Sequence, residues 1–159
     1  MKLLKTIHFD RSDSHAFEQA AGGDEWAISG AFAFSNRAPA AVTGKLKQAF
    51  TNGFLSLESF GWATFASVAE IDETTVQQMS ETLAAHFVLH YGAPALKPAL
   101  PIARNELDFI ANLCEEHPIN TVFTVRRTFD AEGAIHEEYR IVTPPLEPIH
   151  TRVWEIVEE

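Results

Sequence analysis

The sequence predicts an α+β domain over residues 1–159, with a mainly antiparallel sheet of about five or six strands and about three helices packed on one face. Three observations carry this prediction: segments with period-two alternation, helical segments that end at glycine or proline, and a hairpin pattern near the C-terminus. Apolar residues make up 46% of the 159 residues, which is enough for one core of ordinary size.

Three strand-like segments lie in the first half of the chain. Residues 2–9 are expected to form the first strand, and residues 60–71 alternate over a second long one. Residues 26–35 place large side chains on one face and alanines and serines on the other. Because residues 26–35 carry no charge, we expect a central strand that is buried on both faces.

A hairpin is predicted between residues 121–129 and 135–142. Gly133 suits the left-handed position of a type I turn with a G1 bulge, which fixes the pairing of the two strands. A last strand is expected at residues 150–157. The hairpin register opposes Phe129 with Ile135, Val125 with Tyr139, Phe123 with Ile141, Arg127 with Glu137 and Arg126 with Glu138.

Three helices are expected. One lies within residues 39–52 and stops at Gly53, and one runs from after Asp72 to about residue 91, with capping-box spacing at Thr74 and Gln77. The third covers roughly residues 102–116, after a loop marked by prolines at 94, 98 and 101.

The charge balance excludes two classes of partner. Twelve basic residues against 22 acidic ones give a formal net charge of -10, whereas nucleic acids and anionic membranes need a basic footprint. No apolar stretch is long enough for a signal peptide or a membrane helix, so we expect a cytoplasmic protein. Cys114 is the only cysteine, which excludes an internal disulfide and a multi-cysteine zinc site.

His86 and His90 are the one pair with the local spacing of metal ligands. Positions i and i+4 of a helix point the same way, so two imidazoles could share a cation. The segment HFVLH lacks the glutamate of metalloprotease motifs, and His90 aligns with Val76 and Leu83 on the apolar face. The alternative interpretation is therefore a core-facing His90 with His86 at the edge of that face. We expect no cofactor.

Glu106 is the other candidate for acid–base chemistry. It lies near the edge of the apolar face of the third helix, where a carboxylate bordering a cleft would have a raised pKa. Such a glutamate more often reaches out to solvent. Cys114 lies on the apolar face itself and is expected to serve in packing.

Aromatic residues gather in or near two of the predicted strands. The small-residue faces of these strands could receive helices, line a ligand pocket or form a contact between sheets. A strand buried on both faces needs more cover than one helical layer, so we expect a homo-oligomer, most simply a dimer. The candidates for binding a small apolar ligand are Trp26, Phe32, Phe34 and Trp62.

The acidity is concentrated in the middle of the chain. Residues 53–118 carry nine acidic and two basic side chains, which is typical of a solvated helical surface. The alternative is a docking surface for a basic protein partner.

The opening segment MKLLKTIHFDRSDSHAFEQAAGGDEWAISGAFAF, together with SFGWATFASVAE and HFVLHYGAP, resembles a family of small acidic bacterial proteins. These proteins, mainly alphaproteobacterial, carry only a domain-of-unknown-function label, and the resemblance implies a bacterial cytoplasmic protein without implying an activity. Two function classes stay open: a non-catalytic binding or accessory protein that self-associates, and a small metal-assisted or acid–base enzyme using His86, His90 and Glu106.

Overall fold

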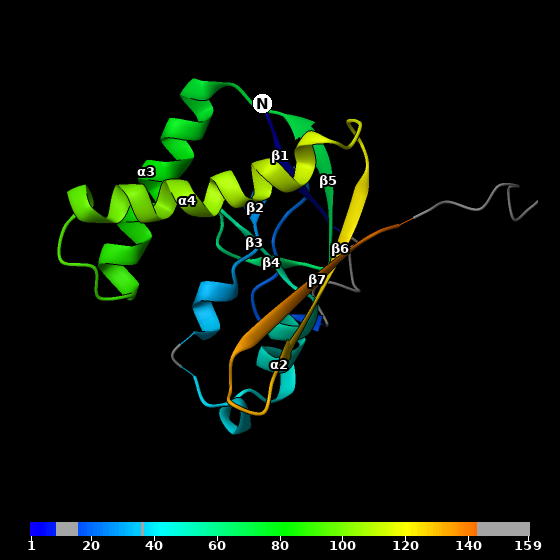
Figure 1. Cartoon of the computed structure of the whole chain (residues 1–159), viewed down its shortest axis with the longest axis vertical. Coiled ribbons are helices and arrows are strands. Elements are labelled where there is room, and N and C mark those ends of the chain that lie inside the picture. The colour runs from blue at the N-terminus through cyan, green and yellow to red at the C-terminus, as the bar shows by residue number, and fades with distance from the viewer. Residues whose placement is uncertain (9–15, 36, 143–159) are drawn as a thin grey trace, which may run out of the picture.

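The computed structural model describes residues 1–8, 16–35 and 37–142, which form a curled antiparallel sheet with helices packed against it (Figure 1). The described part of the sheet has seven strands in the order β4-β3-β2-β1-β5-β6-β7, slightly more than predicted. The strand predicted at residues 150–157 lies outside the described residues. The strands are β1 (Lys2–Ile7), β2 (Trp26–Ile28), β3 (Phe54–Ser56), β4 (Trp62–Ala63), β5 (Phe65–Glu70), β6 (Val122–Phe129) and β7 (Ile135–Ile141).

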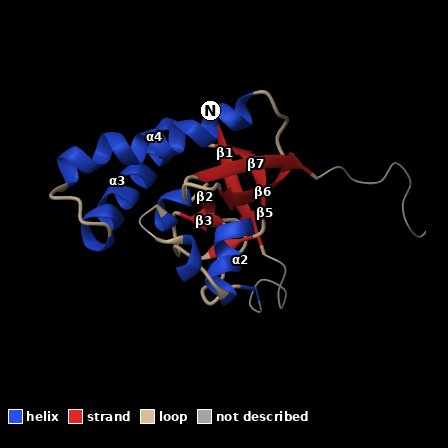
Figure 2. Cartoon of the chain, turned by 60° about the horizontal axis from the view of Figure 1, so that its bottom comes forward, coloured by secondary structure: helices blue, strands red, loops and turns tan. Residues whose placement is uncertain are grey.

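Three α-helices cover one face of the sheet, which confirms the predicted class. They are α2 (Gly44–Asn52), α3 (Glu73–His90) and α4 (Leu96–Glu115), and two short 3-10 helices, η1 (Ala31–Phe34) and η2 (Pro39–Ala41), precede α2. In Figure 1 the two helices of the α3–α4 hairpin cross each other, and Figure 2 shows that the loop that connects them projects from the sheet. No helix in the described part of the chain is both long and apolar enough to cross a membrane.

The core sits between β1 at the centre of the sheet and the α3–α4 hairpin. Leu4 of β1 and Val68 of β5 are fully buried, and they pack in one cluster with Leu83 of α3 and Leu107 of α4. Two neighbouring strands flank β1, so its backbone is paired on both sides. A second, smaller cluster around Phe34 and Phe50 lies beside α2.

The long central strand predicted at residues 26–35 is wrong. Strand β2 ends at Ile28, and Gly30 takes a left-handed conformation (φ 78°) that starts η1. A Cβ atom at residue 30 would lie 2.6 Å from the Leu55 Cβ, so only glycine fits this turn. Because η1 is helical, Phe32 and Phe34 pack in different clusters instead of sharing one face.

Other segments depart from prediction at their boundaries. The segment at residues 60–71 forms two strands, β4 and β5, and the three-residue strand β3 was not predicted. Helix α3 is capped by Asp72, whose carboxylate accepts the Thr75 backbone N–H at 2.7 Å, instead of by a capping box from Thr74.

Helix α4 begins six residues before the predicted start. Pro98 lies in its first turn, where backbone N–H groups have no partner within the helix, so the missing N–H of proline carries no cost there. Pro101 lies further inside and removes one helical hydrogen bond. The apolar face that begins with the buried Ala99 and Ala103 outweighs that loss.

The predicted hairpin register is confirmed for every pair that was named. Phe129 lies opposite Ile135, and the series continues without a slip to Phe123 opposite Ile141. One inference from the register is corrected: Glu138 forms its ion pair with Arg140 of the same strand at 2.8 Å, although Arg126 lies opposite it in the ladder.

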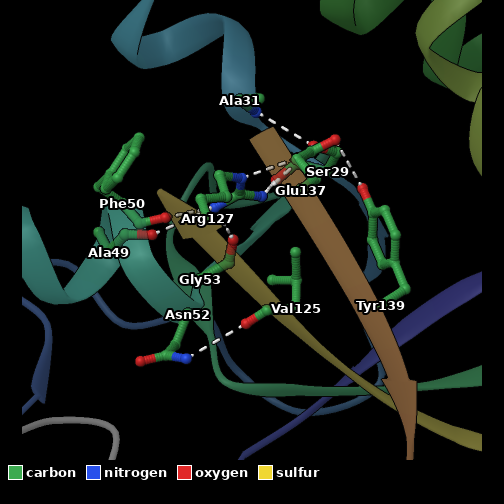
Figure 3. A network of polar contacts seen from close by, with 10 residues as sticks. All are labelled: Ser29, Ala31, Ala49, Phe50, Asn52, Gly53, Val125, Arg127, Glu137 and Tyr139. Carbon is green, nitrogen blue, oxygen red and sulfur yellow. Dashed lines mark hydrogen bonds and ion pairs between the residues drawn. The ribbon is translucent and has the colours of Figure 1, made fainter. Parts of the chain in front are cut away.

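A buried ion pair connects the hairpin to the rest of the domain (Figure 3). Arg127 of β6 is 1% exposed, and its Nε donates to the Glu137 carboxylate of β7 at 2.8 Å. Its Nη1 donates to the carbonyls of Phe50 at 3.0 Å and Gly53 at 2.8 Å, and its Nη2 donates to the Ser29 carbonyl. A cation at the C-terminal end of α2 also interacts favourably with the helix dipole.

Loss of this guanidinium is expected to destabilise the fold strongly. Arg127→Ala leaves the Glu137 charge without its counter-ion and three carbonyls without their donor, so we expect the free energy of unfolding to fall by about 3–5 kcal/mol. The matched control is Arg126→Ala, an exposed arginine next in the chain, for which a change within about 0.5 kcal/mol is expected. Urea denaturation measures both, and equal losses would contradict the assignment.

Candidate functional site

Five of the seven sequence-predicted site residues line two cavities near the C-terminal end of α3. The Glu106 cavity, of about 320 Å³, lies between η1, the α3–α4 loop and the first half of α4. The histidine cavity, of about 550 Å³, lies between η1, the β3–β4 loop and the end of α3. Tyr91, the residue after α3, lines both.

The Glu106 cavity is mainly apolar and has one carboxylate. Phe32 contacts Phe87 and Tyr91 edge to face, with ring centroids 5.0 and 5.3 Å apart. Ile102 of α4 and the prolines at 94 and 98 complete the apolar wall. No lysine, arginine or histidine belongs to the described lining, so Glu106 brings the one formal charge of this cavity.

Glu106 is half-buried and its pKa is raised, because burial disfavours the charged carboxylate and the Glu137 charge repels it. Glu137 is itself satisfied: it accepts hydrogen bonds from Arg127, from Ser29 and, at 3.0 Å, from the Tyr139 hydroxyl. These contacts keep Glu137 in place as a fixed negative charge near the cavity. Burial, followed by the Glu137 charge, raises the pKa of Tyr139, which therefore stays a proton donor.

The histidine cavity holds the predicted His86–His90 pair. The two ring centroids are 4.8 Å apart, and the His86 ring stacks on Phe60 with centroids 3.8 Å apart. Burial lowers the pKa of His86, and the neighbouring His90 lowers it further. Among the described residues, no group of three or more histidine, cysteine or acidic side chains could hold a metal ion, so no third such ligand joins this pair.

The prediction that His90 faces the core is wrong, since His90 is exposed. Its angular position on α3 does match that of Leu83, but the buried face of the helix ends at Phe87. Beyond that point Val88 is still half-buried against the core, whereas Leu89 is 75% exposed. Helical periodicity gives the direction of a side chain but not the length over which a neighbour covers the helix.

The structure does not bring Glu106 and the two histidines into one cavity. Glu106 lines one cavity and the histidine pair lines the other. Cys114 is fully buried on α4, and burial raises the pKa of its thiol to about 12, as expected for a packing role.

The four aromatic residues predicted to bind a ligand do not lie together in one site. Phe32 lines the Glu106 cavity, whereas Trp62 lines the histidine cavity. Phe34 is buried and packs edge to face on Phe50 at 5.2 Å. Trp26 belongs to neither lining, and the Lys5 ammonium lies 4.5 Å from its ring centroid.

Sequence reasoning missed Tyr91 and Arg37, and it placed Arg127 opposite Glu137 without predicting that Arg127 is buried. Tyr91 follows the end of α3, and Arg37 follows the 3-10 helix η1. In such connecting segments no hydrophobic periodicity indicates which way a side chain points. Arg127 did leave a signal, because it shares the inward parity of Phe123 and Val125 on β6. A charge at such a position predicts a buried ion pair.

Comparison with known proteins gives a family but no activity. The model of a family described as "Family of unknown function (DUF6505)" matches residues 1–153, which is nearly the whole chain. No curated protein and no solved structure matches the sequence.

The raised pKa of Glu106 predicts a pH-dependent stability. A carboxyl whose pKa is higher in the folded than in the unfolded chain lowers the free energy of unfolding as the pH rises from the unfolded pKa to the folded pKa. Glu106→Gln removes this cost, so we expect its melting temperature to exceed that of the wild type by about 1–3 °C at pH 8. The difference should vanish near pH 3, below the ordinary glutamate pKa, where both states bind the proton.

Thermal unfolding followed by circular dichroism at several pH values measures this difference. Glu115→Gln is the matched control, because it removes an exposed carboxylate from the same helix, and it should give no comparable gain. A gain for Glu106→Gln that is the same at both ends of the pH range would contradict the assignment.

Proposed function

The chain belongs to the DUF6505 family, whose function is unknown, and we propose that it is a non-catalytic binding protein whose Glu106 cavity takes a small organic cation. The observation that carries this proposal is a single, partly desolvated carboxylate in a largely apolar cavity whose described lining includes no cationic side chain. A ligand with a positive charge supplies the missing partner of this carboxylate. Its apolar body replaces water along the aromatic wall.

The charge of Glu137 strengthens the preference for a cation. Glu137 repels the Glu106 charge even though Arg127 pairs with Glu137, and a bound cation relieves that repulsion. The rings of Phe32 and Tyr91 present further electron-rich surface, to which organic cations are attracted. Anionic ligands meet repulsion from Glu106 at this site.

The geometry supports binding better than catalysis. An acid–base or metal-assisted enzyme built on His86, His90 and Glu106 needs the three groups around one substrate, whereas they line two cavities. The described residues also supply no third histidine, cysteine or acidic ligand for a metal at the histidine pair.

Titration with a matched pair of probes tests the proposed ligand class. Benzylamine carries a positive charge at neutral pH, and benzyl alcohol has the same size without the charge. We expect benzylamine to bind at least about tenfold more tightly, because a hydrogen bond to a charged group contributes about 1.5–3 kcal/mol. Glu106→Gln should abolish this difference while leaving benzyl alcohol binding unchanged.

Nuclear magnetic resonance titration gives both affinities and the location of the probe. Glu115→Gln on the same helix is the control, and it should preserve the preference for the amine. Equal affinities for the two probes, or a preference that survives Glu106→Gln, would refute the proposed ligand class.

We further propose that the chain self-associates through the tip of the α3–α4 hairpin. Large apolar side chains are exposed around this loop: Leu89 by 75%, Leu96 by 52% and Ile102 by 58%. The earlier reason for expecting an oligomer no longer applies, because Ala27 and Ile28 of β2 are already fully buried within the chain. The exposed tip provides a different reason, since exposed apolar surface favours association.

Sedimentation of the purified chain at micromolar concentration tests this proposal. We expect twice the chain mass for the wild type and a single chain mass for the double variant Leu89→Glu and Leu96→Glu. The matched control is Phe109→Glu, an exposed aromatic further along α4, which should leave the dimer intact. A wild type that sediments as a single chain would contradict self-association.

A further inference from the structure

The histidine cavity differs from the Glu106 cavity in the sign of its charged groups. Its described lining includes Arg37 and the imidazoles of His86 and His90. No aspartate or glutamate belongs to its described lining, although the chain has a net charge of -10. A site lined by a guanidinium and two imidazoles favours an anion.

The aromatic wall of this cavity is held in place by close backbone contacts. Trp62 of β4 lies against two glycines: a Cβ at residue 53 would be 2.7 Å from its ring, and one at residue 30 would be 2.9 Å away. Phe34 contacts the same ring from the core side, with centroids 5.5 Å apart. The indole is therefore fixed before any ligand arrives, which reduces the ordering cost of binding.

Phe60 supports the same interpretation through an unfavourable backbone conformation. Its φ of 57° lies in the left-handed region, which is rare for a bulky residue and costs free energy. In this conformation the Phe60 ring stacks flat on His86, with an angle of 3° between the planes. The stack holds His86 on the wall of the cavity, where its ring can contact a ligand.

Arg37 is available for a ligand because it is exposed and lies at the cavity. Its charge is close enough to Tyr91 to act on that phenol: burial raises the Tyr91 pKa, and Arg37 opposes this shift. The guanidinium and the phenol thus belong to the same lining, which also includes Ala33 of η1. A carboxylate there can accept two parallel hydrogen bonds from the guanidinium.

We propose that the histidine cavity binds a small organic anion that carries a flat ring, with Arg37 on the anionic group and the ring against the Trp62–Phe60 wall. The volume of about 550 Å³ is within the range of cavities that bind small molecules. This site goes beyond the proposed cation site, because it uses other residues and takes a ligand of opposite charge. The two proposals can therefore fail independently.

Binding of naphthalene-2-carboxylate tests the inference, with the uncharged naphthalene-2-carboxamide as the matched probe. Isothermal titration calorimetry is expected to show about tenfold or greater preference for the carboxylate. In nitrogen–proton spectra the indole resonance of Trp62 should shift, while that of Trp26 should not. Equal affinities, or shifts confined to Trp26, would overturn the proposal.

Two arginine variants separate this contact from a general effect of charge. Arg37→Gln should reduce the affinity for the carboxylate about tenfold and leave the carboxamide unchanged. Arg126→Gln removes the same charge from an exposed position on β6 and should change neither affinity by more than about twofold. Equal losses in the two variants would mean that the anion responds to net charge alone, which contradicts a site at Arg37.

The pH dependence of the affinity for naphthalene-2-carboxylate is a readout that a folding defect would not reproduce. His86, which lies beside His90 and Tyr91 in a lining that also includes Arg37, becomes cationic as the pH falls, and its lowered pKa places this change below the ordinary imidazole range. Affinity for naphthalene-2-carboxylate should therefore increase from about pH 7 to about pH 5, while the ligand stays largely ionised. In His86→Gln this increase should shrink, and an unchanged increase would contradict the participation of His86.

Discussion

The buried pair of Arg127 and Glu137 is the interaction on which the rest of the domain depends. A guanidinium that is 1% exposed must have every donor satisfied, because a buried unpaired charge is costly. Its partners come from α2, from the end of β2 and from β7, which are distant in sequence. The pair therefore determines where the hairpin, the helix and the η1 turn meet, and the alternative arrangements that leave Arg127 unpaired are disfavoured.

The same pair connects the interior to the cavity. Neutralising Arg127 requires Glu137, and Glu137 in turn places a negative charge near Glu106. Without that charge, Glu106 would be an ordinary half-buried glutamate whose pKa is raised by burial alone. A group that stabilises the fold thus also adjusts the electrostatic potential of a cavity lined by other elements.

Sequence reasoning predicted the elements that local patterns determine. The β6–β7 register was predicted because apolar pairs and opposite charges agreed on one alignment. The strand at residues 26–35 was predicted wrongly because alternation of alanine and phenylalanine fits a strand, whereas the contacts of Gly30 with Leu55 and Trp62 decide the turn. Glu106 was predicted as a candidate site residue from its place at the edge of the apolar helix face. The two cavities could not be predicted, because they depend on loops and on η1, whose sequences show no hydrophobic periodicity.

The η1 helix explains why two cavities of opposite charge can lie so close together. Its helical turn sends Phe32 into the Glu106 cavity and leaves Ala33 on the wall of the histidine cavity. Had residues 31–34 continued β2 as a strand, their side chains would alternate across the sheet and form no such partition. Tyr91 belongs to both linings, so a ligand that displaces its ring in one cavity changes the other. A ligand that moved this ring in one of the two proposed sites would alter the affinity of the other site, and linkage requires the two effects to be equal.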